Sequence, residues 1–232
     1  MFLGDIDPSQ GVEHAQCIAN KISSTSKTAT TSSVPSYKIY CSPFLRCVHT
    51  ASIIATKLKQ TINVEEGLYE WLASSLLIER SNNVRTYPQS ISELKSKFPE
   101  TVNEKFKSLN PYHIDESNDK FSFPEDESQL LSRCNDTLKL ILNDDDNDNI
   151  DHIIIVAHAP CVQSIAFALE EGVEDVKDSK LSKWPLGGIT RFSREIDDVD
   201  GKWNMDFYGI TDHMPGDYKN GAGLWSLSCF DK

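Results

Sequence analysis

The chain has 232 residues, of which 39% are hydrophobic and 25% charged, and its formal net charge at pH 7 is -12. These values predict a soluble globular protein, and the acidic balance argues against direct binding of nucleic acid, whose phosphates attract a basic surface. No apolar run of about 18 residues predicts a membrane span, and the first residues lack the basic-then-apolar pattern of a signal segment. We therefore expect the protein in the cytoplasm or the nucleus, without a membrane partner.

The six cysteines are scattered along the chain, and no two of them form a Cys-x-x-Cys pair. This spacing argues against a zinc site and against a disulfide framework. It favours a reducing compartment, in agreement with the expected location.

The first third of the chain predicts helices and strands in alternation. Residues 11–22 have the apolar spacing of an amphipathic helix, and a loop rich in Ser and Thr follows at 23–36. Residues 37–41 predict a strand and residues 44–59 a helix, after which a short strand begins at Val64.

Residues 74–125 have weak periodicity, and four prolines divide them into short pieces. Such a segment is typical of an inserted cap and not of a core sheet. We therefore expect a single domain over residues 1–232 with a cap at 74–125.

The second half predicts a helix at 127–142, whose apolar residues recur at helical spacing and whose amino end includes Ser128. The elements expected after it are a strand at 152–157, a helix at 160–170, and strands at 188–194 and 203–208. Strands and helices that alternate in this order predict an α/β fold with a mostly parallel sheet.

Two predicted strand-to-helix junctions each carry a cationic side chain. His158 follows the apolar strand and precedes Pro160, while Arg46 follows strand 37–41 in the sequence Ser42-Pro-Phe-Leu-Arg46. Open α/β sheets bind anions at such junctions, because the amino end of a helix offers unpaired N–H groups and a positive dipole. An imidazole and a guanidinium at two strand ends predict a phosphate pocket.

Three motifs occur in a fixed order: Ser42-Pro-x-x-Arg46-Cys-x-x-Thr-Ala, Gly67-Leu-Tyr-Glu70-Trp and Val156-Ala-His158-Ala. Together they resemble the histidine phosphatase (phosphoglycerate mutase-like) superfamily, most closely its fungal branch, which includes the 55 kDa subunit of transcription factor tau. Glu127-Ser-x4-Arg133 and Gly11-Val-Glu-His-Ala are similar to two further segments of this family.

The resemblance implies a three-layer α/β/α sandwich with a mostly parallel sheet. It also implies that Arg46 binds the phosphoryl oxygens and that His158 stabilises the charge that develops on them. Glu70 would be the general acid that protonates the leaving alcohol, which requires a carboxyl of raised pKa. The implied pocket is cationic, so no metal and no other cofactor is expected, and His213 is a candidate substrate contact.

One element of the family pattern is missing from this sequence. The family begins with a strand that ends in Arg-His-Gly, whose histidine is the nucleophile, and no Arg-His pair occurs here. A covalent mechanism needs a nucleophile separate from His158. The first central strand is therefore expected to be absent, either because the sequence is truncated or because the protein has lost catalysis.

These two explanations lead to different functions. In the first, the protein is a phosphatase that acts on a phosphorylated small molecule or a phosphoprotein, and the given chain is inactive. In the second, it is a catalytically inactive scaffold, similar to the tau 55 kDa subunit, with protein partners in RNA polymerase III transcription. The sequence of the cap does not identify a substrate.

Overall fold

The computed structural model of the chain describes residues 10–25, 35–72, 89–111, 124–147, 150–170, 178–195 and 202–230. Most of the Ser- and Thr-rich loop and two parts of the predicted cap lie outside these ranges. Within them, no helix is both long enough and apolar enough to cross a membrane.

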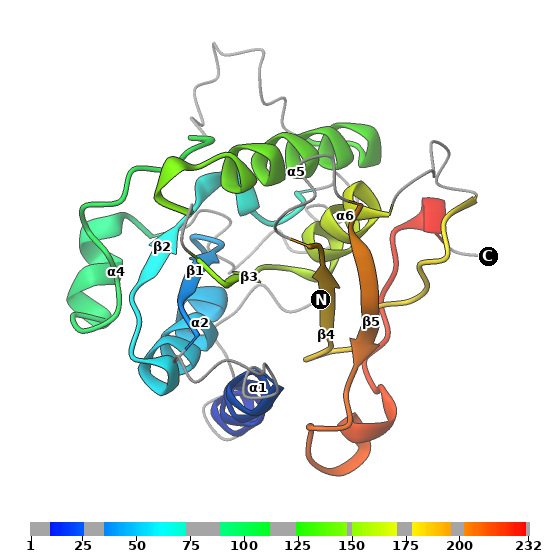
Figure 1. Cartoon of the computed structure of the whole chain (residues 1–232), viewed down its shortest axis with the longest axis horizontal. Coiled ribbons are helices and arrows are strands. Elements are labelled where there is room, and N and C mark those ends of the chain that lie inside the picture. Colours follow the sequence, from blue (N-terminus) through cyan, green and yellow to red (C-terminus); the bar gives the residue numbers. More distant parts are fainter. Residues whose placement is uncertain are drawn as a thin grey trace.

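A parallel three-stranded sheet with the order β2-β1-β3 forms the centre of the fold (Figure 1). It consists of β1 (Tyr37–Cys41), β2 (Ile62–Val64) and β3 (His152–Val156). β1 pairs with both neighbours, opposite Ile62–Val64 on one edge and His152–Val156 on the other. Central parallel strands are apolar because helices cover both of their faces. The predicted α/β fold with a mostly parallel sheet is confirmed.

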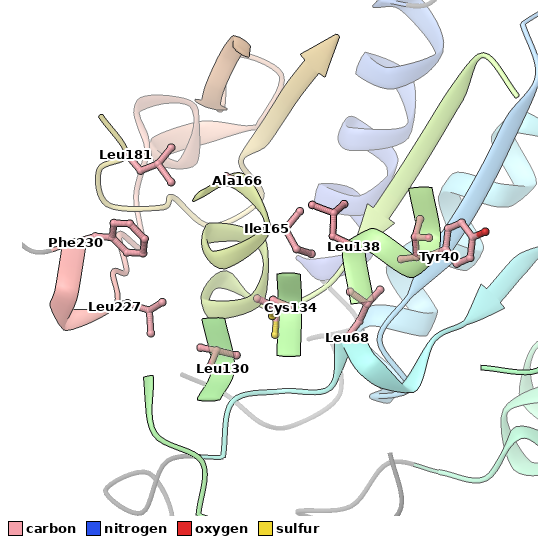
Figure 2. Close-up of a cluster of buried hydrophobic side chains, with 12 residues drawn as sticks. Tyr40, Leu68, Leu130, Cys134, Leu138, Ile165, Ala166, Leu181, Leu227 and Phe230 are labelled. Carbon is pink, nitrogen blue, oxygen red and sulfur yellow. The ribbon is translucent and has the colours of Figure 1, made fainter. Parts of the chain in front are cut away.

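Two pairs of helices cover the two faces of this sheet. α1 (Gly11–Thr25) and α2 (Leu45–Leu58) pack together on one face, and α5 (Glu127–Leu142) and α6 (Ala159–Leu169) pack together on the other (Figure 1). β3 contributes to both hydrophobic clusters: Ile154 and Val156 pack on the α2 side, whereas Ile153 and Ile155 pack on the α5 side. Figure 2 shows the α5 side, where Leu68, Leu130 and Leu138 surround Cys134.

The amino end of α5 differs in detail from the expectation. Asp126, and not Ser128, is the capping residue: its carboxylate accepts from the N–H of Gln129, and the Gln129 side chain accepts from the N–H of Asp126. This reciprocal capping box satisfies two N–H groups that a helix start leaves unpaired. Asp126 lies where the apolar periodicity has not yet begun, so the periodicity alone placed the cap too late.

The described middle of the predicted cap packs directly on the core. It contains α4 (Ile91–Lys97), a helix that weak periodicity did not predict, and Ser90 and Glu93 form a capping box at its start. Val102 forms a parallel bridge with Ile62 of β2, and Leu94 and Val102 belong to the α2-side cluster. The boundaries of the cap stay a prediction, but residues 89–111 extend the sheet side of the molecule.

Leu94→Ala is expected to lower the free energy of unfolding by about 2–5 kcal/mol, because a fully buried leucine leaves a cavity when it is truncated. The matched control is Leu140→Ala, since Leu140 is 43% exposed. Urea unfolding of both variants checks this. A loss at Leu94 no greater than that at Leu140 would show that α4 does not belong to the core.

A separate antiparallel pair lies beyond β3. It consists of β4 (Ile189–Ser193) and β5 (Asn204–Ile210). Burial and the nearby charge of Arg191 on β4 lower the pKa of His152 on β3, so the two strands lie close to one another. No described strand pairs with the second edge of β3 or with that of β4. All five residues of β3 are only partly buried, although three of them are isoleucines.

Candidate active site

The carboxyl ends of all three parallel strands lead to one site. β1 is followed by Ser42 and Arg46, β2 by Glu70 and β3 by His158. Parallel strands end at the same edge of a sheet, which is where α/β folds bind ligands. The sheet therefore brings together side chains that lie up to 112 residues apart in the sequence.

Both cationic side chains lie at the starts of helices. His158 is the N-cap of α6, with Pro160 in the first turn, and Arg46 lies in the first turn of α2, which contains no acidic residue. No side chain caps either helix start. A cation near a helix amino end is unfavourable by about 0.3–1 kcal/mol because it faces the positive end of the helix dipole. Such an arrangement becomes favourable when an anion binds.

The three predicted residues contact one another. Arg46 Nη2 donates to Glu70 Oε2 at 2.6 Å and lies 2.5 Å from His158 Nδ1, which is 3.1 Å from the same carboxylate oxygen. The Glu70 side chain is fully buried, while the Arg46 side chain is 16% exposed. The structure thus places Arg46, Glu70 and His158 in one cluster, with the guanidinium nearest to solvent.

Three further residues hold the imidazole of His158. Ser42 Oγ lies 2.7 Å from Nε2, Cys47 Sγ lies 3.6 Å from the same nitrogen, and the ring of Phe44 meets the imidazole edge-to-face. These residues belong to the turn and first helical turn after β1. The sequence motif supplied Ser42, Phe44 and Cys47 as neighbours of Arg46 but did not indicate that they contact His158.

The charges in the cluster shift both pKa values. Burial alone raises the pKa of Glu70, but the charge of His158, the hydrogen bond with it and the charge of Arg46 outweigh burial and lower that pKa. Burial lowers the pKa of His158, yet Cys47 and Glu70 outweigh both burial and Arg46, so the pKa is raised. The raised pKa expected for Glu70 as a general acid is therefore absent while its carboxylate is paired with these two cations.

This pairing predicts how stability depends on pH. The Glu70 contribution is complete above the ordinary pKa of 4.5 and is lost as the pH falls through the lowered value. The His158 contribution is complete below the ordinary pKa of 6.5 and is lost as the pH rises through the raised value. We expect the difference in free energy of unfolding between the wild type and Glu70→Gln to be largest between these two pH values. Urea unfolding across the pH range measures it, and a difference independent of pH would contradict the pairing.

A buried carboxylate that the sequence did not indicate anchors the segment before Glu70. Glu65, which is fully buried, accepts from the N–H of Gly67, from the hydroxyl of Ser108 and from the N–H groups of Leu109 and Asn110. These contacts join the end of β2 to the described part of the predicted cap. A glutamate after a short strand has no pattern that separates it from an exposed one, so only the structure identifies this role.

His213 is not brought into the cluster. It lies after β5, where its Nε2 is 3.1 Å from the carbonyl oxygen of Gly187. Within the described ranges, no contact joins it to Arg46, Glu70 or His158, and its role as a substrate contact stays a prediction. The same ranges contain no group of three His, Cys, Asp or Glu side chains that could hold a metal ion.

Comparison with known proteins identifies the family. Residues 9–197 match the histidine phosphatase superfamily (branch 1). The chain belongs to this superfamily. A search of curated proteins found no match. Neither result supports a particular relation to the tau 55 kDa branch.

Two solved histidine phosphatase-like structures illustrate the fold. The ecdysone phosphate phosphatase from Bombix mori, in complex with tungstate, is 18% identical, with a TM-score of 0.55 over 88% of this chain and 71% of that chain. A mutant phosphoserine phosphatase from Entamoeba histolytica, in complex with phosphoserine, is also 18% identical, with a TM-score of 0.51 over 91% of this chain and 87% of that chain. At these identities the likeness shows the fold.

Proposed function

We propose that the protein binds and hydrolyses phosphomonoesters at the cluster of Arg46, Glu70 and His158. The observation that carries this proposal is the convergence of a guanidinium, an imidazole and a buried carboxyl from three parallel strand ends. Two cations at helix starts favour a phosphoryl group, whose oxygens accept from both. Membership of the histidine phosphatase superfamily supports phosphoryl chemistry at this edge of the sheet.

Binding of the substrate would change the protonation of Glu70. A phosphoryl group held by Arg46 and His158 takes from Glu70 the two partners that lower its pKa. Burial, which raises that pKa, remains. In the bound state the carboxyl then holds a proton that it can give to the alkoxide oxygen as the P–O bond breaks.

Hydrolysis through a covalent intermediate also requires a nucleophile. We infer that it is a histidine on a strand ending in Arg-His-Gly, which pairs with the second edge of β3. Its attack on phosphorus forms a P–N bond, the P–O bond to the alcohol breaks, and water later cleaves the phosphohistidine. Among the described residues, no histidine other than His158 contacts Arg46 or Glu70.

The sheet supports this assignment. β3 and β4 lie close to one another, and neither has a described strand on its facing edge. An unpaired edge of partly buried isoleucines is a place where another strand adds. A strand parallel to β3 would end at the same edge of the sheet as Arg46 and His158, so its Arg-His-Gly would reach the cluster.

The test is to complete the site and measure hydrolysis of p-nitrophenyl phosphate. A strand of five Val and Ile residues, matching the length of β3, followed by Arg-His-Gly is fused ahead of Met1 or added as a peptide. We expect turnover from the completed protein and none when the added histidine is replaced by alanine. A well-folded completed protein without turnover would favour the scaffold function, for which the structure offers no specific observation.

A further inference from the structure

Arg133 of α5 is a buried arginine with all its contacts turned toward the segment that carries Glu70. Its side chain is 3% exposed. Nε and Nη2 each donate at 2.7 Å to one carboxylate oxygen of Glu125, and Nη1 donates to the carbonyl oxygens of Gly67 and Tyr69 at 2.8 and 3.0 Å. One guanidinium therefore joins the start of α5 to two successive points of the segment before Glu70.

These contacts fix the peptide from which the Glu70 side chain projects. The carbonyl of Tyr69 belongs to the peptide bond that leads into Glu70, and it accepts from Cys161 Sγ at 3.0 Å as well as from Arg133. The neighbouring side chain of Leu68 points into the core beside Leu138 (Figure 2). Rotation of this peptide would break both hydrogen bonds and move the Glu70 carboxylate.

Glu125 links the same segment on its other side. Its N–H donates to the carbonyl of Leu72 at 3.3 Å, and its own carbonyl accepts from Trp71 Nε1 at 2.9 Å. The residues on both sides of Glu70 are thus held by the Arg133–Glu125 pair, directly or through one backbone contact. Glu125 is also the last residue of the predicted cap.

A buried ion pair is a weak source of stability, because removing two charges from water offsets much of their attraction. An apolar side chain could fill the same space, but it could not bind two carbonyls and a carboxylate in one plane, as a guanidinium does. We propose that Arg133 is a positioning residue that holds Glu70 within reach of Arg46 and His158. This inference rests on the proposed function only for the catalytic meaning of Glu70, since the positioning itself is a matter of geometry.

The experiment follows the titration of His158 by NMR in the 232-residue chain, so it requires no hydrolysis. Glu70 raises the pKa of His158, so a displaced Glu70 lowers it. Arg133→Met is compared with Arg133→Lys, which keeps the charge but not the fork. Arg191→Met is the matched control, because it removes an arginine paired with Asp206 on the β4–β5 pair. Each Arg133 variant is also made in a Glu70→Gln background.

We expect Arg133→Met to shift the His158 titration downward, Arg133→Lys to shift it less, and Arg191→Met to leave it unchanged. In the Glu70→Gln background the Arg133 substitutions should have no further effect, because the group through which they act is gone. If Arg133→Met does not fold, Arg133→Lys and Glu125→Gln decide by the same measurement. An unchanged titration in the folded variants, or an equal shift with and without Glu70, would overturn the proposal. Loss of the phosphatase proposal alone would leave these results as they are.

Discussion

Replacing Arg46 with methionine is expected to lower the free energy of unfolding by roughly 3 kcal/mol, because the substitution leaves a buried carboxylate without its strongest partner. The Glu70 side chain is fully buried, and its Oε2 accepts from Arg46 at 2.6 Å. His158 remains as a neighbour of that oxygen at 3.1 Å, so the loss is smaller than for an isolated buried charge. Urea unfolding at neutral pH measures the difference.

The double variant Arg46→Met/Glu70→Gln is the control for this result. It removes the buried charge together with its partner, so it should be more stable than Arg46→Met alone. A single variant as stable as the wild type would show that the ion pair is not formed in solution. Additive effects of the two substitutions would lead to the same conclusion.

Replacing His158 with alanine is expected to lower kcat for p-nitrophenyl phosphate by about 10²–10³-fold in the strand-completed protein, the range found when one preorganised donor to a developing oxyanion is removed. The imidazole is held by Ser42 and lies beside both Arg46 and Glu70. Its loss therefore removes a positioned donor and not only a charge. Steady-state kinetics with the two proteins checks the prediction.

His152→Ala is the matched control, because His152 lies at the opposite end of β3 from the site and stacks on Tyr37. We expect this variant to retain kcat within a few-fold, since surface-side substitutions away from a site rarely affect chemistry. Equal losses for the two histidines would assign the effect of His158→Ala to the fold of β3. In that case His158 would not be a catalytic residue.

The parts of this molecule that were predictable from the sequence are those with a strong local pattern. The strand over residues 37–41 and the helix over 127–142 have the predicted bounds, because an apolar run and a helical apolar stripe are read directly from the chain. Arg46, Glu70 and His158 were also predictable as neighbours, since parallel strands end at a common edge. The resemblance of their motifs to one family is confirmed at the level of the superfamily.

The parts that were not predictable depend on contacts between distant segments. α4 is short and begins with a capping box, Ser90 and Glu93, within a region whose prolines suggested only loops. Arg133 and Glu65 are charged residues whose partners lie about 40 or more residues away, so no local pattern distinguishes them from exposed side chains. The direction of the pKa shift of Glu70 likewise follows from its two cationic neighbours and not from its burial.

The most direct test of the proposed phosphate site is calorimetric titration of the 232-residue chain with inorganic phosphate. Binding should be saturable, and it should be lost in Arg46→Met and strongly weakened in His158→Ala. Lys38→Met is the control, because it removes a cation paired with Asp144 and should leave binding unchanged. Absence of binding by the wild type, or equal binding by Arg46→Met, would contradict the assignment of a phosphate site to Arg46 and His158.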